Sequence, residues 1–108
     1  MTVSTASLLA ALEGTGLAVC YNAFPEGAAV ELPWIVYRYV SSNHLTADNK
    51  VYKTVDNYDI EYYNKVKCSE DEERIRQALD SLGVIYAELE VTIESENVIE
   101  HVFSVQLI

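Results

Sequence analysis

The stretch that decides the fold is residues 51–79, VYKTVDNYDIEYYNKVKCSEDEERIRQAL, where a tyrosine-rich strand pattern passes directly into a helix pattern. Over residues 55–65 the side chains alternate, with Tyr58, Ile60 and Tyr62 on one face of the expected strand. The opposite face carries Asp59, Glu61, Tyr63 and Lys65. The stretch therefore predicts a strand with one buried face, followed by an amphipathic helix that packs on the sheet.

The expected helix begins at Ser69 and is ended by Gly83. Ser69 and Glu72 have the spacing of a capping box, and the acids at 70–73 suit the positive end of the helix dipole. Its expected buried stripe consists of Ile75, Ala78, Leu79 and Leu82. The acidic run EDEE thus has a structural explanation and does not indicate catalysis.

The rest of the chain shows one more helix pattern and several strand patterns. We expect the other helix over residues 5–13 and strands over 17–21, 34–40, 84–93 and 98–107, with a loop at 22–33. The order is helix, strand, hairpin, helix, hairpin. It predicts an α+β fold, with a mostly antiparallel sheet of four to five strands and two helices packed on it, in a single domain over residues 1–108.

The last hairpin supplies the remaining expected core. Alternation places Leu89, Val91 and Ile93 inward, with Glu88, Glu90, Thr92 and Glu94 outward. On the return strand, one face carries His101, Phe103, Val105 and Leu107. Residues 41–54 are polar and longer than a usual hairpin connection, so we expect a mobile loop there that is either functional or disordered.

The charge balance argues against a broad nucleic-acid surface. The formal net charge is −10, from 17 acids and seven bases, whereas phosphate contacts need clustered Lys and Arg. All seven bases lie between positions 38 and 76, and both flanks carry only acids. Such segregation can be satisfied within one fold, or between identical subunits in a head-to-tail ring.

Residues that could support catalysis or bind a cofactor are scarce. The two cysteines, Cys20 and Cys68, match no metal-binding spacing, and we expect ordinary thiols in a reducing compartment. DNYDIE differs from a calcium loop in having Tyr58 at a ligand position, and no glycine-rich phosphate loop is present. No leader pattern and no apolar run of about 20 residues is seen, so we expect an intracellular protein. We expect no enzyme, no cofactor and no metal.

The aromatic residues point to contact with protein. Eight tyrosines and one tryptophan are more than a small core accommodates with every hydroxyl satisfied. Tyrosines on both faces of one strand suggest one core face and one interface face.

Three segments, LPWIVYRYV, ADNKVYKTVDNYDIEYYNKVKCSEDEERIRQAL and YAELEVTIESENVIEHVFSVQL, carry a family resemblance. In this order they resemble the small neck and tail-completion proteins of siphophages and prophages, over residues 32–108. The resemblance implies a tail terminator: a subunit of a usually hexameric ring that caps the tail tube and joins it to the head connector or stopper protein. It implies assembly in the host cytoplasm, a final place in the tail or neck of the virion, and passage of genomic DNA without specific binding. A head-completion protein of the neck and a small non-catalytic protein-binding module remain alternatives.

Within such a ring, the sequence suggests two complementary surfaces. Lys50, Tyr52 and Lys53 of the expected loop would reach a neighbouring subunit or the tail tube, and Tyr63 would lie on the interface face of its strand. The acidic counterpart would consist of Glu88, Glu90, Glu94 and Glu96. Six subunits at −10 each would carry −60, so we expect an acidic channel wall that lets DNA slide.

Overall fold

The computed structural model describes residues 4–22, 31–47 and 50–107, with the side chains of these residues except at 45–47, 50–53 and 96. Most of the loop expected at 22–33 lies outside the described residues. The elements are α1 (Thr5–Glu13), β1 (Ala18–Tyr21), β2 (Trp34–Ala47), β3 (Lys50–Asn64), α2 (Ser69–Leu82), β4 (Ile85–Ile93), a 3₁₀ turn (Glu94–Glu96) and β5 (Val98–Leu107).

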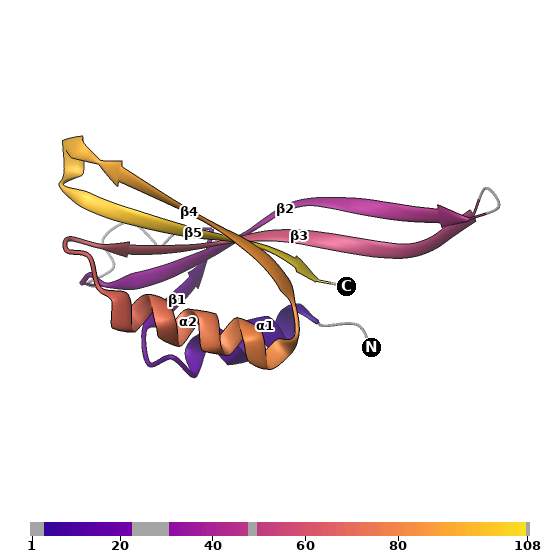
Figure 1. Cartoon of the computed structure of the whole chain (residues 1–108), viewed down its shortest axis with the longest axis horizontal. Helices are drawn as coiled ribbons and strands as arrows, with labels where there is room; N and C mark the ends of the chain where they lie inside the picture. The colour runs from indigo at the N-terminus through magenta and orange to yellow at the C-terminus, as the bar shows by residue number, and fades with distance from the viewer. Residues whose placement is uncertain (1–3, 23–30, 48–49, 108) are drawn as a thin grey trace.

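The five strands form one sheet in the order β1-β2-β3-β5-β4. β1 pairs with β2 in parallel, and the other three pairs are antiparallel. Both helices lie against the same face of the sheet, which gives two layers (Figure 1). The α+β class with a mostly antiparallel sheet is confirmed.

Helix α2 has the expected bounds, but its N-terminal cap differs from the prediction. Gly83 follows it with φ +69°, a left-handed conformation that glycine adopts without strain. The N-cap is Cys68, which makes no side-chain capping bond, so the capping box predicted for Ser69 and Glu72 is wrong. Glu72 is instead buried, and its carboxylate lies 2.8 Å from Lys67 Nζ. The ion pair with Lys67 balances the buried charge, so the Glu72 side chain does not cap the helix.

The core lies between the helices and the sheet. Its members include the predicted Tyr58, Ile60 and Tyr62 of β3, Ile75 and Leu79 of α2, and Phe103, Val105 and Leu107 of β5. Leu82 is partly buried at its margin, and α1 adds Leu8 and Leu12. The predicted core faces of β3, β5 and α2 are therefore confirmed.

The predicted faces of β4 are reversed. Leu89 and Val91 are 62 % and 41 % exposed, on the face away from the helices. Directly paired residues of antiparallel strands share a face, and Glu88 and Glu90 pair with the buried Phe103 and His101. The two glutamates therefore point toward α2. Alternation alone identifies two faces without saying which one a helix covers.

The segment expected as a mobile loop at 41–54 forms the end of a long hairpin instead. The β2–β3 ladder continues through Asn43 opposite Val55 to Ala47 opposite Lys50. In Figure 1 this hairpin projects far beyond the other strands, and the longest dimension of the molecule is 50 Å. Two polar strands can satisfy their backbone groups by pairing with each other in solvent. The polar composition of the segment therefore did not indicate strands. We call residues 41–56 the hairpin arm.

Candidate assembly surface

The predicted basic site maps to the end of the hairpin arm. The first four residues of β3 include Lys50, Tyr52 and Lys53, whose side chains lie outside the described part of the chain. The register shifts here, since Leu45 pairs with Lys53 and Thr46 with Val51. Tyr52 is thus the extra residue of an irregularity, a place where strands commonly redirect a side chain.

The predicted acidic site is divided by the structure. Glu94 is exposed in the 3₁₀ turn between β4 and β5. Glu96 ends that turn, and its side chain is not among those that the structure describes. Figure 1 shows this turn and the arm tip at opposite ends of the long axis. The turn and the tip therefore cannot meet within one subunit, but they could meet between subunits.

Glu88 and Glu90, by contrast, already have cationic partners in the chain. The Arg76 guanidinium contacts the Glu88 carboxylate at 2.8 Å, and Lys67 Nζ lies 2.6 Å from Glu90 Oε1. Arg76 lowers the pKa of Glu88, and Lys67 lowers that of Glu90. Both carboxylates are therefore charged and neutralised internally, which the outward placement in the sequence prediction did not anticipate.

The face of the sheet opposite the helices, here called the outer face, carries exposed apolar side chains. These are Val40 at the base of the arm and Ile85, Leu89 and Val91 of the edge strand β4, each 41–62 % exposed. A groove of about 390 Å³ is lined by Val40 and Ile85, together with Asp59 and Ser104. Apolar residues gathered in this way are typical of surfaces that another protein covers.

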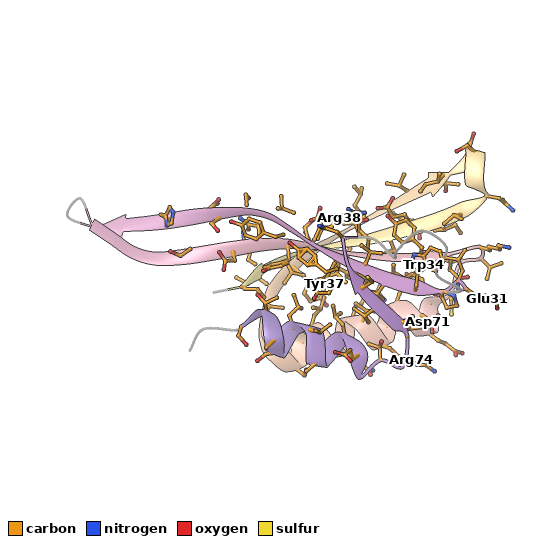
Figure 2. The ribbon with its side chains drawn as sticks, turned by 180° about the vertical axis from the view of Figure 1, so that it is seen from behind. Glu31, Trp34, Tyr37, Arg38, Asp71 and Arg74 are labelled. Atoms are coloured by element: carbon orange, nitrogen blue, oxygen red, sulfur yellow. The ribbon has the colours of Figure 1, made fainter. Side chains whose placement is uncertain are left out.

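Tyr63 lies on the outer face as predicted, within a polar network. Its hydroxyl donates to Glu61 Oε1 at 2.6 Å, and Arg38 Nε donates to the other oxygen of Glu61 at 2.9 Å. Figure 2 shows Arg38 on β2, close to where the strands cross in that view. Burial raises the pKa of Tyr63, and the hydrogen bond to Glu61 raises it further. Burial also raises the pKa of Glu100, whose oxygen lies 3.3 Å from the same hydroxyl.

A second polar cluster lies under the sheet, between α2, β4 and β5. It brings Glu72, Glu90 and His101 together, with one potential ligand atom of each within 4.8 Å of the others. Sequence analysis missed this cluster because its members lie on three separate elements. The spacing along the chain contains no signal of it.

Comparisons with known proteins find similarity among solved structures. No protein-family model matches the chain, and no curated protein matches it. Among solved structures, the chain is similar to a chain in the virion of a native gene transfer agent particle, with a TM-score of 0.51 and 15 % sequence identity. The match covers 96 % of this chain and 86 % of that chain. At 15 % identity the likeness shows a shared fold over nearly the whole chain.

In the described part of the chain no helix is long and apolar enough to cross a membrane.

Proposed function

We propose that this protein is a structural component of a phage-type virion, and specifically a tail terminator. The observation that carries the proposal is the fold likeness to a chain of a gene transfer agent virion over 96 % of the sequence. The motif resemblance over residues 32–108 points independently to the same class. In this proposal the subunits form a ring, with six copies the expected number, that caps the tail tube and joins it to the head connector.

Two unlike surfaces on the subunit support a ring built head to tail. A heterologous contact needs two different complementary surfaces on each copy, and closes when the rotation permits. The hairpin arm supplies two lysines, Lys50 and Lys53, and the β4–β5 turn supplies an acidic surface through Glu94 and Glu96. Glu88 and Glu90 contribute less, because Arg76 and Lys67 already neutralise them.

Apolar contact should carry most of the affinity. Exposed charge pairs are individually worth about 0–1 kcal/mol. Leu89 and Val91 offer apolar area on an uncovered sheet edge, and Tyr52 and Tyr63 add aromatic area. We propose that a second copy of the chain covers the outer face of β4, while Tyr52 is buried against a neighbouring subunit or the tube.

The proposal places the protein in the tail or neck of the virion, without catalytic activity. Its partners are further copies of itself, the tail tube protein and the head-connector or stopper protein. Genomic DNA would pass along an acidic channel wall without specific binding, since like charge prevents adhesion. A head-completion protein of the neck, or a small protein-binding module, would use the same apolar surface to bind another partner.

The test is to purify the protein, measure its mass by light scattering after size exclusion, and image it by negative-stain electron microscopy with tail tubes. We expect a closed ring, alone or once bound, at one end of each tube. Binding to head connectors but not to tube ends would replace the terminator with the head-completion protein. A persistent monomer that binds neither would contradict the virion proposal.

A further inference from the structure

His101 contains a buried nitrogen without a hydrogen-bond partner. The residue is 6 % exposed, and its Nδ1 is the buried side-chain atom left unpaired among the described residues. The other ring nitrogen, Nε2, lies 2.8 Å from Glu88 Oε1. A carboxylate only accepts, so Nε2 carries a proton, and when the ring is neutral Nδ1 presents a lone pair.

That lone pair faces two carboxylate oxygens. Glu72 Oε1 and Glu90 Oε1 each lie 3.6 Å from His101 Nδ1. The distance is too long for a hydrogen bond even if Nδ1 were protonated. With the neutral ring, three acceptor atoms converge on one point, an arrangement that is favourable only around a cation.

Two of the three spacings between these atoms are close to those of a tetrahedral metal site. Ligands about 2.1 Å from a zinc ion are separated by about 3.4 Å across a tetrahedral edge. Both distances from the imidazole nitrogen are 3.6 Å, and all three ligand atoms lie within 4.8 Å. A small shift of the partly exposed Glu90 would complete the geometry.

The surroundings of His101 are those of a metal ligand. A histidine that binds a metal usually donates its other N–H to a carboxylate, which fixes the tautomer and the ring orientation. Glu88 accepts that bond here, and the Arg76 guanidinium fixes Glu88 through contacts of 2.8–3.1 Å. The second shell is thus already in place.

Lys67 supplies the cation in the present arrangement. Its Nζ lies 2.8 Å from Glu72 Oε1 and 2.6 Å from Glu90 Oε1, between the two carboxylates. The Lys67 side chain is 47 % exposed and belongs to the connection between β3 and α2. It can therefore move into solvent without disturbing the core, whereas no hydrogen bond joins it to His101 Nδ1.

We propose that Glu72, Glu90 and His101 form a binding site for a divalent transition metal ion of the zinc type, which replaces the Lys67 ammonium. The imidazole and two carboxylates would be the protein ligands, and a water molecule would take the fourth position. The ion would join α2, β4 and β5 at one point. This inference is independent of the proposed virion function, because all three ligands belong to one subunit.

The experiment titrates Zn²⁺ into the protein carrying Cys20→Ser and Cys68→Ser, which removes competing thiols. Calorimetry should give one ion per chain, and the melting temperature should rise with Zn²⁺ concentration. Glu90→Gln should weaken binding at least tenfold, and Glu88→Gln should weaken it by about 10–100-fold through the histidine. Lys67→Met should tighten binding, because the competing ammonium is gone.

Matched controls separate this site from surface binding. Glu94→Gln removes an exposed carboxylate just beyond β4, and His44→Ala removes the histidine of the arm, so neither should change the affinity. Nitrogen NMR of the imidazole should show the His101 Nδ1 resonance shifting on saturation with Zn²⁺, a signal that a purely structural role would not produce. Equal losses in the controls, an unshifted Nδ1 resonance, or unchanged affinity in Lys67→Met would each overturn the proposal.

Discussion

Leu79 and Leu89 lie on opposite sides of the sheet and differ greatly in the solvent exposure of their side chains. Leu79 of α2 is 0 % exposed within the core, whereas Leu89 of β4 is 62 % exposed on the outer face. Truncation of a buried leucine removes apolar contacts and leaves a cavity, whereas truncation at an exposed position leaves none. The two residues therefore form a matched pair for testing which face is buried.

Leu79→Ala should lower the free energy of unfolding by about 2–5 kcal/mol. Leu89→Ala should change it by less than about 0.5 kcal/mol, because the side chain is exposed in the isolated subunit. Urea denaturation at a concentration where the protein is monomeric measures both. Equal losses would mean that the face assignment is wrong.

Tyr62 links the sheet to α2 through its hydroxyl. The hydroxyl donates to Asp71 Oδ2 at 2.6 Å and accepts from Asn64 Nδ2 at 2.9 Å. Burial, and then the hydrogen bond to Asp71, raise the pKa of Tyr62 well above its ordinary value of 10.0. The folded state thus favours the protonated phenol.

Tyr62→Phe should change both the stability at neutral pH and its alkaline dependence. The folded-state pKa lies above the unfolded one, so this stabilisation is present below about pH 10 and is lost as pH rises toward the folded-state pKa. Substitution should reduce that alkaline slope and cost about 1–3 kcal/mol at pH 7, because Asp71 loses a buried donor. Denaturation midpoints from pH 7 to 11 measure both effects, with Tyr39→Phe as the exposed control at pH 7. An unaltered slope would contradict the assignment.

At the scale of elements, the hairpin arm is the feature least tied to the core. Within the described residues, none of the core cluster lies between positions 41 and 54. The arm is stabilised instead by its own ladder, including side-chain contacts such as His44 Nδ1 with Thr54 Oγ1 at 3.2 Å. An element of this kind can be shortened without opening the core.

Replacing residues 44–54 by Asn-Gly would join Asn43 to Val55, which already pair, through a two-residue turn. The free energy of unfolding should change by less than about 1 kcal/mol, since none of the core side chains that the structure describes is removed. Ring formation and attachment to tail tubes should be lost, as light scattering and electron microscopy would reveal.

Two variants that keep the arm serve as controls. Lys50→Glu with Lys53→Glu should slow assembly in a salt-dependent way, because exposed charges are screened. Tyr52→Ala should weaken assembly at any salt concentration. Intact rings after shortening would mean that the arm plays no part in assembly.

At the scale of the whole molecule, the outer face and the helix-covered face have opposite roles. The helix-covered side buries the core and neutralises its acids internally, while the outer side presents apolar residues to solvent. A ring of such subunits would bury the outer side of β4 between copies.

Leu89→Glu should therefore prevent assembly while the monomer stays folded, because a charge would be buried without a partner. Thr92→Glu adds the same charge on the same strand but on its other face, and should leave assembly intact. Light scattering gives the mass of each variant, and circular dichroism confirms folding. Equal assembly of the two variants would exclude the outer face of β4 as the contact.

The sequence by itself determined the features that depend on neighbouring residues. Helices Thr5–Glu13 and Ser69–Leu82 have the predicted bounds, because local apolar spacing and a following glycine specify them. The strict alternation of Tyr58, Ile60 and Tyr62 identified the core face of β3. The α+β class followed from the order of these elements.

Only the tertiary structure decided what depends on partners distant in the chain. Which face of β4 meets the helix is set by its register with β5, since a period of two describes both faces equally. The arm exists because two polar segments satisfy each other's backbone groups, which neither could do alone. The cluster of Glu72, Glu90 and His101 is likewise absent from any local pattern, because packing α2 on the β4–β5 pair is what brings its three side chains together.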